Sequence, residues 1–133
     1  MIKRLLLLIV FLTGAGLSAE TPREGAKAIL ELVKDRNYAV IFNERYAEWH
    51  KVEDAKRRPE EAIQKLSLGW ELNRDMVLSI FKQLSKADYE IGTNPDPQES
   101  ETGEIAVTTV IIGDRTIPYQ LYKLKSGLWG FHM

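Results

Sequence analysis

One short segment of this chain has the residue types of a metal site. His50 is followed by Glu53 and Asp54, and residues three and four positions apart share a face of a helix. Imidazole nitrogen and carboxylate oxygen are ligands that divalent metals accept. A single histidine with two acids also describes an ordinary polar helix end, and no other ligand cluster occurs in the sequence. We therefore predict no metal and no other cofactor.

Nucleophilic catalysis has equally little support. The chain has no cysteine, and none of the serines after residue 19 lies in the Gly-x-Ser-x-Gly context of a nucleophile elbow. Only two histidines are available to activate a hydroxyl, and one of them, His132, fits the end of a strand better than a catalytic position. We predict no catalytic residue.

Aromatic side chains are the remaining candidates for a binding site. Amphipathic rings can line an apolar pocket and supply its few polar contacts. The same rings also recur at helical spacing, which is typical of an ordinary core. If a pocket exists, we expect Tyr46, Trp49, Trp70 and Tyr119 to bind the ligand. These four belong to a larger set that also includes Phe42, Phe81 and Trp129.

The N-terminal half of the chain is expected to be helical. Thr21 and Glu24 can form a capping box around Pro22, which suits the first helical position. Apolar residues at helical spacing then predict a helix that ends before a break at residues 35–37.

Three further helices follow in the same half. The first carries apolar residues from Tyr38 to Trp49, and the second begins at Pro59 and leads to Gly69. Asn73 can cap the third. The apolar residues of this last helix are Met76, Val77, Ile80, Phe81 and Leu84.

The C-terminal half changes to short runs of β-branched and aromatic residues, which indicate strands. Gly113-Asp114 and Ser126-Gly127 are turn sequences, so antiparallel hairpins are expected. Pro118 cannot donate to a ladder and predicts an edge or a bulge. The fold class is therefore α+β, with helices on one face of a single antiparallel sheet. The four predicted strands are Tyr89 to Gly92, Ile105 to Ile112, Thr116 to Leu124, and Leu128 to His132.

The first 19 residues have the order of parts of a cleavable export signal. Lys3 and Arg4 precede the apolar run from Leu5 to Leu12, and small residues follow. A membrane span would need about 20 apolar residues, more than this run provides. Cleavage after Ala19, or alternatively after Ser18, would leave an exported protein, periplasmic or secreted, that is soluble and has no stable membrane anchor.

The remaining chain, residues 20–133, has the size of one domain. Removing 19 of 133 residues leaves 114, enough for one hydrophobic core. The absence of cysteine excludes a lipid anchor on that residue and any disulfide. Removing Lys3 and Arg4 reduces the 18 basic residues to 16 against 19 acidic ones, a formal charge of −3. This balance argues against nucleic acid or an anionic membrane as partner.

The order of elements and two local motifs resemble the nuclear transport factor 2-like superfamily. The first motif runs from Ile117 to Phe131 and combines a strand ending in lysine, a glycine turn and a tryptophan, as in the closing hairpin of exported bacterial members. The second is the opening helix, with Ala26, Ile29 and Leu30 before residues 35–38. The resemblance implies helices packed on the concave face of a curved four-stranded sheet. A cystatin-like or unrelated α+β domain remains the alternative.

Enzymes that belong to this superfamily place acid–base side chains inside the cone of the sheet. No aspartate, glutamate or histidine interrupts Ile105 to Ile112 or Thr116 to Leu124, so these positions lack a base. We therefore expect an exported binding domain of the cell envelope, for a small apolar ligand or a protein partner. The alternative is a cofactor-free isomerase, dehydratase or hydrolase of the same fold. A homodimer with a structural role is a third interpretation.

Overall fold

The computed structural model describes residues 20–47, 58–95 and 100–131 of the chain. Within these ranges helices come first and strands follow, and every strand pair is antiparallel in the order β1-β2-β3-β4. The predicted α+β class is therefore confirmed. The elements are α2 (Pro22–Lys34), α3 (Tyr38–Glu44), α4 (Pro59–Leu72), α5 (Arg74–Leu84), β1 (Glu90–Thr93), β2 (Glu104–Ile112), β3 (Arg115–Lys123) and β4 (Trp129–Gly130).

Several predicted features lie outside the described residues. They are the export signal of residues 1–19, the ligand candidate Trp49, the cluster His50, Glu53 and Asp54, and His132. None of the helices in the described ranges combines the length and the hydropathy that a membrane span requires.

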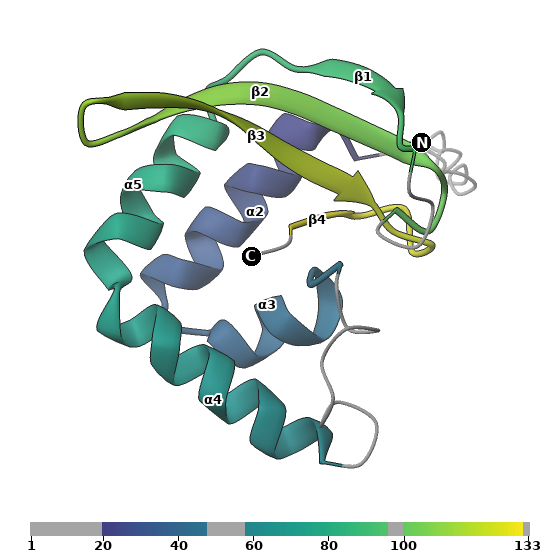
Figure 1. The fold of residues 1–133 in the computed structure, drawn as a ribbon. Helices are drawn as coiled ribbons and strands as arrows, with labels where there is room; N and C mark the ends of the chain where they lie inside the picture. Colours follow the sequence, from purple (N-terminus) through teal and green to yellow (C-terminus); the bar gives the residue numbers. More distant parts are fainter. Residues whose placement is uncertain (1–19, 48–57, 96–99, 132–133) are drawn as a thin grey trace, which may run out of the picture.

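The sheet arches over the helices, which fill its concave side (Figure 1). α2 packs against α5 and β4, and α5 packs against β2. α4 packs on α3 and α5 and lies farther from the sheet than α2 does (Figure 1). The helices therefore form two layers beneath the sheet, and the main core contains buried side chains from α2, α3, α4 and α5 and from β2, β3 and β4.

The backbone nitrogen of Pro118 in β3 points away from the neighbouring strand β2. Pro118 is paired with Thr109 in an unbroken register without a bulge. Ile111, two residues farther along β2, turns both its N–H and its C=O to the Gln83 side chain, at 2.7 Å each. In an antiparallel pair, the backbone groups of every second residue point the same way, so those of Thr109, like those of Ile111, point away from β3. Its partner Pro118 therefore directs its backbone nitrogen and carbonyl away from β2. β4 pairs only with the last two residues of β3, so the predicted edge position is confirmed.

The start of α2 forms as its sequence predicts. The Glu24 backbone N–H donates to Thr21 Oγ1 at 3.1 Å, and the Thr21 N–H donates to Glu24 Oε1 at 2.9 Å. Both bonds of the capping box are therefore present, and they satisfy two donors that a helix start leaves without a partner.

The helix that begins at Tyr38 ends at Glu44, earlier than its apolar pattern predicts. The Arg45 carbonyl accepts the Phe131 N–H at 2.9 Å, and the Ala47 N–H donates to the Phe131 carbonyl at 2.8 Å. This pairing adds a short parallel bridge beyond β4. Residues 45–47 therefore leave the helix because their backbone groups bond to the sheet instead.

α4 continues past Gly69, where the sequence predicts its end, to Leu72. Asn73 stands between α4 and α5, but its side chain does not cap α5. Its Nδ2 donates to the Gly69 carbonyl at 2.9 Å, so it satisfies the last turn of α4. The predicted helix boundary at Asn73 is therefore correct. The predicted cap is wrong, because the Asn73 side chain bonds to the end of α4 and not to the start of α5.

Candidate functional site

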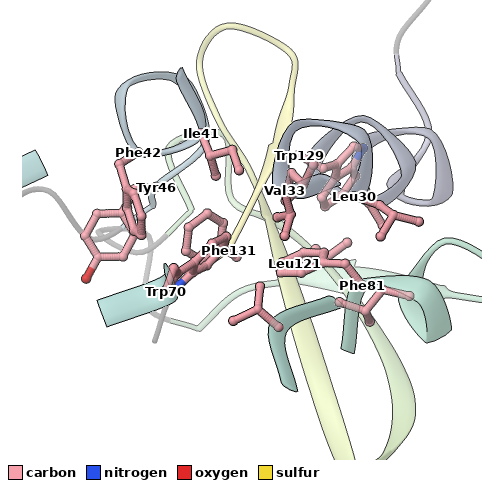
Figure 2. Close-up of a cluster of buried hydrophobic side chains, with 14 of the residues drawn as sticks. Leu30, Val33, Ile41, Phe42, Tyr46, Trp70, Phe81, Leu121, Trp129 and Phe131 are labelled. Carbon is pink, nitrogen blue, oxygen red and sulfur yellow. The ribbon is translucent and has the colours of Figure 1, made fainter. Parts of the chain in front are cut away.

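Tyr46 and Trp70, two of the predicted ligand-binding residues, lie in one aromatic cluster. Phe131, which follows β4, links them: its ring centroid is 5.4 Å from that of Tyr46 and 4.9 Å from that of Trp70. Phe42 on α3 contacts the same two rings and Phe131. Figure 2 shows Phe131 near the middle, with Phe42 and Tyr46 to one side and Phe81 to the other. Phe131 is not one of the aromatic residues predicted to line a pocket.

The rings of this cluster pack directly against one another. Their centroid separations range from 4.9 Å for Phe42 and Trp70 to 6.1 Å for Phe81 and Phe131, within the range of favourable aromatic pairs. Phe131 and Phe42 are completely buried, and Tyr46 and Trp70 are 9% and 7% exposed. The cluster is therefore closed packing in which Phe131 fills the centre.

Tyr119, a third predicted ligand-binding residue, lies on β3 beside Tyr89. Among the described residues it has no ring contact with the Tyr46 and Trp70 cluster, although it packs against the same core. Burial raises the pKa of Tyr119 to about 12. Burial and the neighbouring Tyr119 raise the pKa of Tyr89, whose hydroxyl donates to the Leu84 carbonyl at 2.6 Å. Both hydroxyls are therefore neutral near pH 7 and act as core polar groups.

A shallow cavity of about 450 Å³ lies at the junction of α4 and α5, beside the end of α2. We call this region the α4–α5 corner. Its wall mixes charged, amide and aliphatic side chains. The lining residues are Arg36, Glu71, Leu72, Asn73, Arg74, Asp75 and Met76.

Hydrogen bonds hold the charged side of this cavity. Glu71 Oε1 accepts the Tyr38 hydroxyl at 2.8 Å and lies 3.2 Å from Arg36 Nε. The Tyr38 hydrogen bond, followed by the charge of Arg36, lowers the pKa of Glu71. Burial, followed by the Glu71 hydrogen bond, raises the pKa of Tyr38. Glu71 is therefore ionised at neutral pH, and the neutral Tyr38 hydroxyl donates a hydrogen bond to it.

The end of α2 orients the two arginines of the cavity wall, Arg36 and Arg74. Arg36 has φ +56°, the left-handed conformation that closes a Schellman motif, with its own N–H bonded to the Val33 carbonyl. An arginine here is unusual, because this position favours glycine. Arg74 Nη2 donates to the Val33 and Lys34 carbonyls at 3.2 and 2.9 Å, where a cation meets the negative end of the helix dipole.

The corner also carries exposed aliphatic side chains. Leu68, Leu72 and Met76 are 59%, 76% and 49% exposed, and the latter two line the cavity. Met76 is one of the apolar residues of the predicted helix, but Val77 and Phe81 point inward and Met76 remains half-exposed. Leu68 and Leu72 are one turn apart, opposite the buried face of α4. Two leucines on an otherwise polar face are the sequence signal for this site.

No group of three or more histidine, aspartate or glutamate side chains within residues 20–47, 58–95 and 100–131 could hold a metal ion. Comparisons of the chain with known protein families, with curated proteins and with solved structures found no match.

Proposed function

We propose that this chain is an exported binding domain, resembling the nuclear transport factor 2-like superfamily, whose ligand is a protein docked at the α4–α5 corner. The observation that carries the proposal is the exposure of Leu68, Leu72 and Met76 beside an open cavity. A small apolar ligand has less support, because Phe131 already fills the centre of the aromatic cluster.

The distribution of exposed aliphatic side chains favours the corner over the sheet. Five large apolar side chains are exposed in the described part of the chain. Two of them, Leu72 and Met76, line the cavity, and Leu68 lies one turn before Leu72 on α4. The other two, Ile91 and Ile111, are on different strands. Single exposed apolar residues are common on protein surfaces, whereas a contiguous group beside a cavity is typical of an interaction site.

The polar groups of the corner are already positioned for a partner. Glu71 is held by Tyr38 and Arg36, and Arg74 is held by the end of α2. A partner that inserts an apolar side chain between Leu72 and Met76 would therefore pay little to order the rim. Methionine adapts its shape to such an insertion. This arrangement suits an apolar anchor surrounded by polar contacts.

Site-specific photocrosslinking in the cells that make the protein tests the proposal. A photoreactive residue at position 72 should yield one defined protein adduct, and Met76→Glu in the same chain should abolish it. The matched control is position 111, because Ile111 is 58% exposed on β2 and lies away from the corner. Mass spectrometry should also detect a processed chain that begins at Glu20 or Ala19.

Two results would contradict the proposal. Equal adducts from positions 72 and 111 would show nonspecific contact, and an adduct with the mass of two copies would show that the corner joins a homodimer.

Substitutions at Leu72 should leave thermal unfolding unchanged, because 76% of this residue is already exposed.

A further inference from the structure

A buried ion pair joins Glu20, two residues before α2, to Arg45, the residue after α3. Glu20 and Arg45 have side chains that are 16% and 8% exposed. Arg45 Nη1 donates to Glu20 Oε2 at 2.9 Å, and Nη2 donates to Oε1 at 3.0 Å. The pair is therefore bidentate, the geometry in which a guanidinium recognises a carboxylate most specifically.

The backbone of β4 supplies further contacts to the same two residues. The Trp129 N–H donates to Glu20 Oε2 at 2.9 Å, so the carboxylate accepts three hydrogen bonds. The Trp129 carbonyl accepts from Arg45 Nη1 at 3.1 Å, and the indole Nε1–H donates to the Glu20 carbonyl at 2.9 Å. Segments 109 residues apart in the sequence are joined at this point.

The surroundings are shaped to the carboxylate. Gly25 lies on the first turn of α2, and a Cβ atom there would stand 2.8 Å from Glu20 Oε2 and 3.0 Å from the Trp129 Cβ. Arg45 Nε is buried and has no hydrogen-bond partner among the described residues. An arginine left without its carboxylate here would be an uncompensated buried charge, which is strongly destabilising.

We propose that Arg45 and the backbone of Trp129 form a carboxylate-binding site, and that Glu20 occupies it as a tethered ligand. The three donors are supplied by residues other than Glu20, and they converge on the position of its two oxygens. A free carboxylate of matching size can therefore take the place of the Glu20 side chain when that side chain is removed.

The site also controls where β4 lies. β4 is only two residues long and pairs with β3 at Tyr122 and Lys123. Its Trp129 is held by Glu20, and Phe131 follows two residues later at the centre of the aromatic cluster. Loss of the tethered ligand, by substitution or by proteolysis that removes Glu20, should therefore loosen Phe131 as well as Arg45.

Rescue with acetate tests the site in the full chain. Glu20→Ala removes one methylene and the carboxylate, a fragment that acetate matches. Its midpoint of thermal unfolding should fall by about 10 °C or more in sodium chloride, because one member of a buried pair is missing. In sodium acetate at about 0.5 M it should recover a substantial part of that loss, through binding to the folded state alone.

Two variants separate site binding from the general effect of the salt. Glu31→Ala removes an exposed glutamate from α2, the helix that follows Glu20, and its response to acetate should equal that of the unmodified chain. Glu20→Gln leaves the site filled by an uncharged group, so it should be less stable than the unmodified chain and gain nothing extra from acetate.

Each remaining outcome decides the proposal. If Glu20→Ala folds in acetate and not in chloride, the site is supported, because acetate then stabilises the folded state by binding to it. The proposal is overturned if Glu20→Ala and Glu31→Ala respond equally to acetate, if Glu20→Ala is unfolded in both salts, or if Glu20→Gln is as stable as the unmodified chain.

Discussion

Replacing Gly130 with alanine should destabilise the domain although it adds a single methyl group. Gly130 belongs to β4 and lies against the backbone of Arg45. A Cβ at position 130 would overlap the Arg45 carbonyl oxygen and stand 3.0 Å from Leu124 Cδ1. The backbone angles of Gly130 lie outside the left-handed region, so space alone excludes the methyl group.

The size of the effect follows from what must move. The Arg45 carbonyl cannot retreat without losing its bond from the Phe131 N–H, and Arg45 itself is only 6% exposed. Overpacking in such a site costs about 1–3 kcal/mol, and a lost backbone hydrogen bond adds about 1 kcal/mol. We expect the free energy of unfolding to fall by about 2–4 kcal/mol.

Gly69→Ala is the matched control, because it makes the same chemical change in the interior of α4. A Cβ at that position meets no heavy atom within 4 Å, and alanine favours a helix over glycine by about 0.5–1 kcal/mol. Urea unfolding followed by circular dichroism should therefore give shifts of opposite sign at equal m-values. A Gly130→Ala protein as stable as the unmodified chain would refute the close approach of β4 to Arg45.

Three further predictions concern the core and the first helix. Phe131→Ala should lower the free energy of unfolding, measured in urea, by about 3–5 kcal/mol, because a completely buried ring is lost. A loss below about 1 kcal/mol would show that the aromatic cluster collapses around the gap. Tyr119 is neutral in the folded state up to about pH 12 but ionises near pH 10 when unfolded, so its contribution is complete below pH 10 and lost as the pH rises towards 12. Tyr119→Phe should flatten that part of the stability–pH profile, and an unchanged slope would contradict the burial of the hydroxyl. Thr21→Ala should cost about 1 kcal/mol in the same urea assay by removing the capping box, and Thr21→Ser should retain most of the stability.

Local chemistry explains the features that were predictable from sequence. The capping box at Thr21, the helix start at Pro59 and the turn at Gly113 depend on residues adjacent in the chain. Gly113 has φ +65° as the first residue of its two-residue turn, a conformation that favours glycine. Runs of β-branched and aromatic residues placed β2 and β3 within one residue of each predicted boundary. These signals are short-range, so they remain valid whichever way the elements pack.

The candidate site was less predictable, because it depends on which faces the elements turn to each other. Met76 and Val77 are both apolar residues of one predicted helix, and only the packing of α5 shows that Val77 and Phe81 occupy the inward face. The aromatic residues were identified individually, but their closure around Phe131 requires β4 to return beside α3. A periodic pattern contains no information on that return.

The sequence by itself determined the kinds of element, most of their boundaries and the α+β class, because propensities, caps and turns act over a few residues. The tertiary structure decided which aliphatic side chains stay exposed at the α4–α5 corner and which buried charges meet. Glu20 and Arg45 are ordinary charged residues in the sequence, 25 positions apart. They become a bidentate buried pair only because β4 brings the Trp129 backbone between the start of α2 and the end of α3.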